Sequence, residues 1–107
     1  LTVQRKLHLQ ISVPGHDSWS VDLDKDEVVI GRVASCDVHL PLTNVSRQHA
    51  HIVTNEDSTF IQDLDSTNGV FVNGIKIVKC ILRNNDVIQV GDSRLLFVEE
   101  KTRQPLK

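Results

Sequence analysis

The sequence lacks the features of membrane-spanning, exported and general nucleic-acid-binding proteins. No apolar run approaches the roughly 18 residues that a membrane-spanning helix needs, and the first six residues have no apolar stretch typical of a signal peptide. Twelve basic side chains against fourteen acidic ones give a formal net charge of -2, whereas a general nucleic-acid surface needs a basic excess. We therefore expect an intracellular protein, in the cytoplasm or nucleus, that contacts neither nucleic acid nor membrane.

Cysteine is also scarce. Cys36 and Cys80 are far apart in the sequence and form no CxxC pair. Isolated cysteines of this kind behave as small apolar residues in a reducing compartment. We expect two free thiols, with a disulfide as the less favoured alternative.

The 107 residues, 39% of them hydrophobic, suffice for one compact domain, because a chain of this length buries roughly 60 to 65% of its unfolded surface. We place this domain at residues 7 to 99. Residues 1 to 6 are expected to be a flexible N-terminal segment and residues 100 to 107 a C-terminal tail. Because the sequence does not begin with Met and ends abruptly, it is expected to be part of a longer protein.

No apolar stripe of helical period persists for ten residues, and short apolar segments with alternating or continuous patterns take its place. Leu7, Leu9, Ile11 and Val13 alternate with polar residues, as in a strand with one buried face. Asn73-Gly74 between apolar segments is a strong signal for a tight hairpin. The pattern predicts an all-β antiparallel sandwich or barrel. The expected strands are residues 7–13, 19–23, 28–30, 38–40, 49–54, 60–64, 70–72, 75–78, 87–90 and 94–99.

Residues 31 to 37, 41 to 48 and 65 to 69 form polar loops, which in such folds carry binding functions. Their side chains offer guanidinium, hydroxyl and carboxamide groups, a donor set that suits a phosphate dianion. Alternatively, these residues serve only as turn formers and solvated charges. The candidate donors are Arg32, Ser46, Arg47, Thr67 and Asn68.

The order of the loop motifs favours the anion-binding interpretation. Gly31-Arg32, Ser46-Arg47-Gln48-His49-Ala50, the stretch from Asp63 to Gly74 and Gly91-Asp92 resemble the GR, SxxH, DLxSTNGxxxNG and GD signatures of the forkhead-associated (FHA) domain family. The resemblance covers about residues 7 to 98. It implies a β-sandwich of about eleven strands whose loops at one end bind phosphothreonine in partner proteins, so that the module recruits or regulates its parent signalling protein.

The resemblance also implies residue roles. Arg32 and Ser46 are expected to hold the phosphate, and Arg47 to add a further contact. Asn68 is expected to bond the peptide backbone, supported by Thr67. Structural roles in the binding loops are expected for Gly31, His49, Gly69 and Asn73.

One position departs from the family pattern. The family commonly has Gly where this chain has Asp65, but Asp tolerates left-handed turn conformations. We expect the Asp65 side chain to point to solvent.

Three other interpretations compete with this one. Ser46, His49 and Asp63 supply the residue types of a hydrolytic triad, but the Gly-x-Ser-x-Gly elbow is absent. His49, His51, Asp63 and Asp65 suggest a metal site, but the calcium-loop pattern fails at its sixth and twelfth positions. We therefore expect no enzyme activity, no metal and no cofactor. An FHA fold that binds a partner through another face, independently of phosphate, remains the main alternative.

Overall fold

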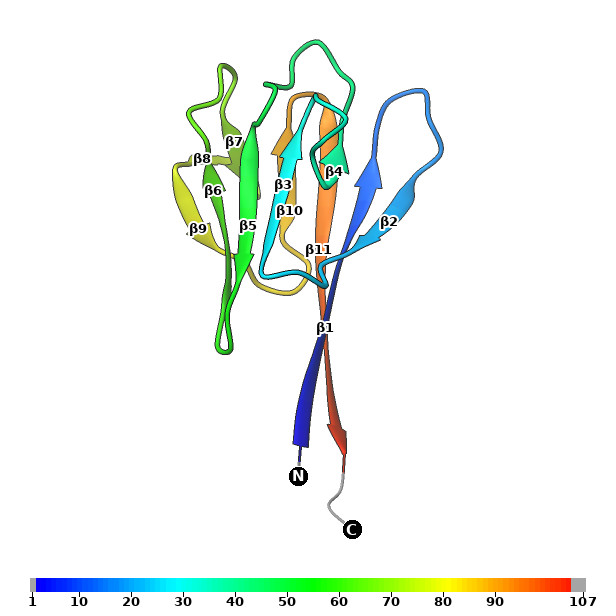
Figure 1. Ribbon diagram of the computed structural model, residues 1–107, viewed down its shortest axis with the longest axis vertical. Coiled ribbons are helices and arrows are strands. Elements are labelled where there is room, and N and C mark those ends of the chain that lie inside the picture. Colours follow the sequence, from blue (N-terminus) through cyan, green and yellow to red (C-terminus); the bar gives the residue numbers. More distant parts are fainter. Residues whose placement is uncertain (1, 105–107) are drawn as a thin grey trace.

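The computed structural model describes residues 2–104 of the chain, and the side chains of residues 5–101. These residues contain eleven strands (Figure 1). These residues contain no helix that is long and apolar enough to cross a membrane. The strands are β1 (Thr2–Ser12), β2 (Trp19–Asp22), β3 (Glu27–Gly31), β4 (Val38–His39), β5 (Ala50–Thr54), β6 (Thr59–Asp63), β7 (Val70–Val72), β8 (Ile75–Ile77), β9 (Lys79–Ile81), β10 (Val87–Val90) and β11 (Ser93–Gln104).

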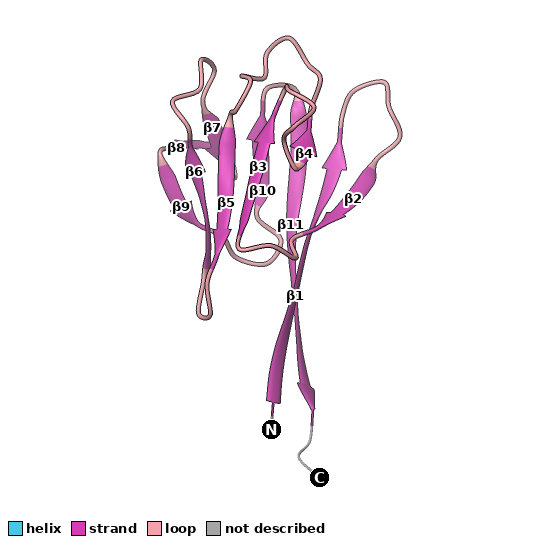
Figure 2. Cartoon of the chain, in the orientation of Figure 1, coloured by secondary structure: helices cyan, strands magenta, loops and turns pink. Residues whose placement is uncertain are grey.

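The strands form two sheets that pack face to face. One sheet has the order β2-β1-β11-β10-β7-β8, and the other has the order β4-β3-β5-β6-β9. The loops that precede β4, β5 and β7 lie together at one end of the sandwich (Figure 2). The all-β sandwich expected from the sequence is confirmed.

Strand β1 shows how the sequence pattern builds the core. Leu9 and Ile11 are fully buried, and Leu7 and Val13 nearly so, while the residues between them face outward. The other sheet contributes side chains such as Ile30, Ile52 and Ile61 to the same core. Burying each such side chain stabilises the fold by about 1.5 to 3 kcal/mol, so the core holds both sheets in a fixed relation.

Three details differ from the sequence interpretation. Strand β4 runs parallel to β3, so the sandwich is not purely antiparallel. The segment expected as a strand over residues 75–78 is β8, but the separate strand β9, which follows it and pairs with β6 in the other sheet, was not expected. Trp19, Val21 and Leu23 alternate with polar residues, which predicts a buried face, but Trp19 is 38% exposed and lies on β2, the outermost strand of its sheet.

The hairpin between β7 and β8 is confirmed at Asn73-Gly74, where both residues have positive φ, 51° and 83°. The Asn73 amide donates to Asp86 Oδ1 and accepts from the Val87 N–H, each at 2.9 Å. Asn73 was expected among the binding loops. The structure corrects this, because Asn73 lies at the opposite end of β7 and fixes the turn before β10.

Beyond the sandwich, β1 and β11 continue as a two-stranded ribbon that leaves the end opposite to the polar loops (Figure 1). Arg5 joins the base of this ribbon to the sandwich. Its guanidinium donates to Glu99 Oε2 at 2.9 and 2.6 Å and to Thr59 Oγ1 at 3.1 Å. Strand pairing thus extends past the expected boundaries at residues 7 and 99. The flexibility of residues 1–6 and 100–107 stays a prediction, and Leu1 and residues 105–107 lie outside the described residues.

Arg5→Ala is expected to lower the free energy of unfolding by about 1 to 3 kcal/mol, because it removes the guanidinium that donates to the half-buried Glu99 carboxylate and to the buried Thr59 hydroxyl. For a domain of this size, each kcal/mol lowers the melting temperature by about 4 to 8 °C. Lys101→Ala is the control, since Lys101 is exposed and lies 3.8 Å from Glu99. Equal melting temperatures for the two variants in calorimetry would contradict the role of Arg5.

Candidate functional site

The first polar loop begins where β3 ends, at Gly31-Arg32, and lies directly against the loop before β5. The Arg32 N–H donates to the carbonyl oxygens of Ser46 and Arg47 at 3.0 and 3.1 Å. A Cβ at Gly31 would lie 2.1 Å from the Arg47 carbonyl oxygen, a separation that no side chain tolerates. Glycine at position 31 therefore permits the close approach that brings Arg32, Ser46 and Arg47 together.

The two arginines present their guanidinium groups to solvent. Arg32 is exposed, and its Nε donates to the Val45 carbonyl at 3.0 Å. That bond fixes the plane of the guanidinium and leaves both Nη atoms without a partner among residues 5–101. Arg47 is also exposed and makes no ion pair with any side chain that the structure describes. Arg32 thus supplies a positive charge whose orientation is held, and Arg47 supplies a second, exposed positive charge.

Ser46 joins this surface to the loop before β7. Its Oγ accepts a hydrogen bond from the Thr67 N–H at 3.1 Å, so its own proton is free to be donated. The Asn68 amide nitrogen donates to the Asn44 carbonyl at 3.0 Å, which leaves the Asn68 carboxamide oxygen available. Hydroxyl, carboxamide and guanidinium groups are thus carried on loops that bond one another.

His49 lies beneath these loops and is fully buried. Its Nδ1 accepts from the Ser46 N–H at 3.0 Å, and its Nε2 bonds the Gly69 carbonyl oxygen at 2.7 Å. Because a carbonyl can only accept, Nε2 carries the proton and Nδ1 does not. The imidazole therefore ties the loop before β5 to the loop before β7. These contacts are the basis for a bracing role, which stays a prediction.

The loop before β7 is shaped by its own side chains. Asp63 Oδ1 accepts from the Ser66 N–H, and Ser66 Oγ accepts from the Gly69 N–H, each at 2.9 Å. Asp65 and Gly69 have φ values of 57° and 84°, which is the left-handed region. Asp65 is also exposed. The sequence predicts that Asp65 tolerates a left-handed turn and that its side chain faces solvent. Both predictions are confirmed.

The geometry does not assemble a hydrolytic triad. Both His49 nitrogens are occupied by backbone groups, so neither can take the proton of the Ser46 hydroxyl. The Asp63 carboxylate bonds the Ser66 N–H instead of an imidazole. Ser46 therefore has the role of a hydrogen-bonding hydroxyl in this arrangement.

His51 lies outside the site, where it bonds Glu27 and Gln62. Among the described residues, no group of three histidine, cysteine or acidic side chains is placed to hold a metal ion. The absence of a metal and of a cofactor stays a prediction.

The contacts by which Asn44 joins two other segments were not predicted from the sequence. Its side-chain oxygen accepts from the Asp92 N–H at 3.3 Å, while its carbonyl accepts from Asn68. A Cβ at Gly91 would lie 2.4 Å from the same Asn44 oxygen, so the glycine makes room for this contact. The Gly91-Asp92 motif was the available signal, but its partner lies 48 residues away.

Two further side chains fix the loop between β3 and β4. The Cys36 thiol donates to the Arg47 carbonyl at 3.3 Å, and burial raises the pKa of Cys36. Asp37 accepts from the Val29 N–H at 2.9 Å, and its hydrogen bond with Lys25 lowers the pKa of its carboxyl. Both cysteines are free, as expected, although Cys80 is only half-buried.

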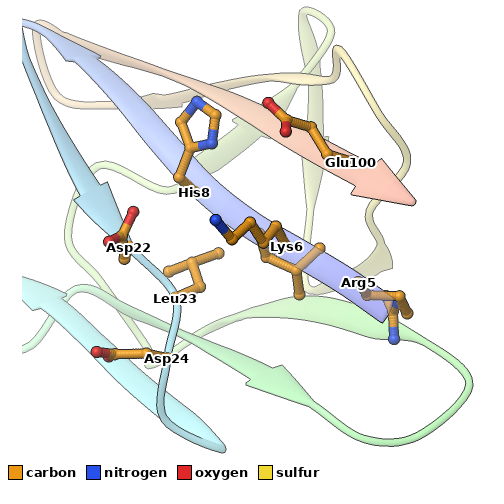
Figure 3. Close-up of a pocket in the computed structure, with 8 residues that line it drawn as sticks. Arg5, Lys6, His8, Asp22, Leu23, Asp24 and Glu100 are labelled. Carbon is orange, nitrogen blue, oxygen red and sulfur yellow. The ribbon is translucent and has the colours of Figure 1, made fainter. Parts of the chain in front are cut away.

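Two hollows in the described surface lie outside the donor set. One of about 370 Å³ lies between β1, β2 and β11, with Lys6, His8, Asp22 and Glu100 around it (Figure 3). A second of about 280 Å³ lies beside the loop before β5. Neither hollow includes Arg32, Ser46 or Asn68. Arg32, Arg47, Thr67 and Asn68 are themselves exposed, which suits contact with an extended polymer segment.

Comparison with known families gives a match in the part of the chain that carries the loops. A family model described as the FHA domain matches residues 28–91. An ABC transporter ATP-binding/permease protein of Mycobacterium tuberculosis is 36% identical over 78 residues, which is 73% of this chain and 9% of the transporter. An oxoglutarate dehydrogenase inhibitor of Corynebacterium jeikeium is 37% identical over 76 residues, or 71% of this chain and 53% of the inhibitor. The chain thus spans about half of one relative and a small part of the other.

Solved structures share the fold over most of the chain. One, from a structural and functional analysis of phosphothreonine-dependent FHA domain interactions, has a TM-score of 0.78 and 30% identity, and covers 94% of this chain and 99% of that chain. Another, EmbR of Mycobacterium tuberculosis in complex with a low affinity phosphopeptide, has a TM-score of 0.79 and 32% identity, and covers 87% of this chain and 24% of that chain.

His49→Ala is expected to lower the free energy of unfolding by about 1 to 3 kcal/mol, because it leaves the Ser46 N–H and the buried Gly69 carbonyl without partners. The melting temperature falls by about 4 to 8 °C for each kcal/mol. Arg32→Ala, which removes an exposed side chain of the same site, is expected to melt like the wild type. An unchanged melting temperature for His49→Ala in calorimetry would show that the imidazole does not brace the loops.

Proposed function

The chain belongs to the FHA domain family, and from that membership we propose that it binds phosphothreonine-containing segments of partner proteins through its loops. The observation that carries the proposal is the exposed donor set of Arg32, Ser46 and Asn68, with buried His49 beneath it. A phosphate with a charge of about −1.5 to −2 and three acceptor oxygens matches fixed guanidinium and hydroxyl donors. The proposal requires no catalytic step.

Arg32 and Ser46 bind the phosphate in this proposal. The two Nη atoms of the exposed Arg32 are available to the phosphate because only Nε is used by the Val45 carbonyl, and the Ser46 hydroxyl donates its free proton. Arg47 adds a further phosphate contact from the next position in the chain. Charge-assisted hydrogen bonds of this kind contribute about 1.5 to 3 kcal/mol each, which suffices to favour a phosphorylated segment.

Asn68 and Thr67 bind the backbone of the partner segment. The Asn68 amide nitrogen is held by Asn44, so its oxygen is directed to an incoming N–H group, and Thr67 supports it from the adjacent position. Residues 41–45 lie beside the apolar hollow that includes Pro41 and Leu42. This loop contributes to the choice of residues flanking the phosphothreonine.

The domain acts as a binding module that recruits or regulates its parent protein. One solved relative comes from an analysis of phosphothreonine-dependent FHA domain interactions, and another is in complex with a phosphopeptide. One curated relative is named as an inhibitor of an enzyme. The free thiols of Cys36 and Cys80 support an intracellular location, because disulfides are rare in reducing compartments. Nucleic acid, membrane and cofactors have no part in the proposed function.

A phosphothreonine peptide selected from a library is expected to bind with micromolar affinity, about −8 kcal/mol, and its unphosphorylated twin at least tenfold more weakly. The difference arises because only the phosphorylated peptide uses the guanidinium and hydroxyl donors. Isothermal titration calorimetry with both peptides measures it. Equal affinities would remove the proposal and favour an FHA fold that binds through another face, independently of phosphate.

Matched variants sharpen this experiment. Arg32→Lys is expected to lose nearly as much affinity as Arg32→Ala, because a compact ammonium cannot reproduce the planar donors of a guanidinium. Arg83→Lys is the control, since Arg83 is exposed in the turn that precedes β10. Wild-type affinity in Arg32→Lys would mean that Arg32 acts only through its charge.

A further inference from the structure

Lys76 is placed by the hairpin of β7 and β8 to reach the loop before β7. It pairs directly with Phe71, so residue 69, two positions before Phe71, is its diagonal neighbour across the two strands. Diagonal neighbours lie within reach of long side chains. The register therefore directs the Lys76 side chain toward Gly69, the last residue of the loop that carries Thr67 and Asn68.

Gly69 leaves the space through which the Lys76 side chain passes. A Cβ at Gly69 would lie 2.8 Å from Lys76 Cε and 3.6 Å from Lys76 Nζ. The methylene chain of Lys76 thus packs over the Gly69 backbone, and the ammonium lies next to the loop. Gly69 is itself held in place, since its carbonyl oxygen bonds His49 and its N–H bonds Ser66.

The Lys76 ammonium has no ion-pair or hydrogen-bond partner among the residues whose side chains are described. Lys25 and Lys79 differ in this respect. Lys25 bonds Asp37, and Lys79 lies 4.3 Å from the centre of the Phe60 ring. Asp65, the exposed acidic residue of the loop, does not come within ion-pair distance of Lys76. The ammonium group of Lys76, on β8, therefore lies beside this loop in addition to the donors assigned above.

We propose that Lys76 determines specificity by binding an acidic side chain of the partner segment next to the phosphothreonine. The inference rests on the proposed function, because it places the segment across Asn68, the neighbour of Gly69. An ammonium beside that backbone contact meets the side chain of a residue close to the phosphothreonine. The substrate class is thus narrowed to phosphothreonine segments with an aspartate or glutamate at one flanking position.

The test uses the library-selected phosphothreonine peptide, with Asp or the isosteric Asn placed in turn at each of the three positions before and after the phosphothreonine. The probes are titrated into wild type, Lys76→Gln and Lys79→Gln. Glutamine keeps part of the methylene chain over Gly69 and removes the charge. Lys79→Gln removes an equal charge from β9, the next strand along the chain, where the lysine lies over Phe60.

At one position, Asp is expected to bind wild type about two- to fivefold more tightly than Asn, the range of an exposed ion pair. The preference is lost in Lys76→Gln and kept in Lys79→Gln. Absence of any Asp preference in wild type, its survival in Lys76→Gln, or equal weakening of all peptides by that substitution would each overturn the inference.

The same titrations separate this inference from the function on which it rests. Phosphate dependence without a Lys76-dependent Asp preference overturns only the role of Lys76. Equal binding of the phosphorylated and unphosphorylated peptides to wild type overturns both proposals.

Discussion

One buried imidazole bonds two of the loops that carry the proposed binding site. The ring of His49 accepts from the Ser46 N–H on one side and donates to the Gly69 carbonyl on the other. A neutral imidazole is suited to this position, because it offers one acceptor and one donor at opposite sides of a rigid ring. Either backbone group, if left unpaired, would cost about 1 to 3 kcal/mol.

These hydrogen bonds hold the donors of the exposed surface in place. Ser46 and Gly69 are fixed by the imidazole, and Arg32 is fixed by its bonds to the loop that contains Ser46. Donors held in this way need little ordering when a ligand arrives, and ordering a long side chain costs about 0.5 to 1.5 kcal/mol. In the proposed function, the exposed loops therefore form a site whose donors are already held before the partner segment binds.

Local pattern was enough to predict much of the fold. The alternation in β1 and the Asn73-Gly74 turn depend on neighbouring residues, and both were read from the sequence. The separate strand β9 and the parallel pairing of β4 depend on partners far along the chain. Alternation of apolar residues cannot say which sheet a strand joins, so these features were missed.

The candidate site was likewise predicted where local motifs specify it and missed where it depends on distant segments. The family motifs placed Arg32, Ser46 and Asn68 in adjacent loops, but they did not show that Asn44 joins two of those loops. They also grouped Asn73 with the loops, although its side chain bonds the turn before β10. The Asn73 contact with Val87 lies within one sheet, where β7 pairs with β10, and the Asn44 contact with Asp92 joins loops of the two sheets, 48 residues apart in the sequence. Both contacts arise only once the strands have paired and packed.

The state of the His49 ring tests the account most directly. Nitrogen-15 NMR of the imidazole, recorded for the free domain and with a saturating phosphothreonine peptide, reports which ring nitrogen carries the proton. A neutral ring with the proton on Nε2 is expected in both states, because the two backbone partners stay in place when the ligand binds. A proton on Nδ1 in the free domain, or a change of tautomer or charge on binding, would contradict it.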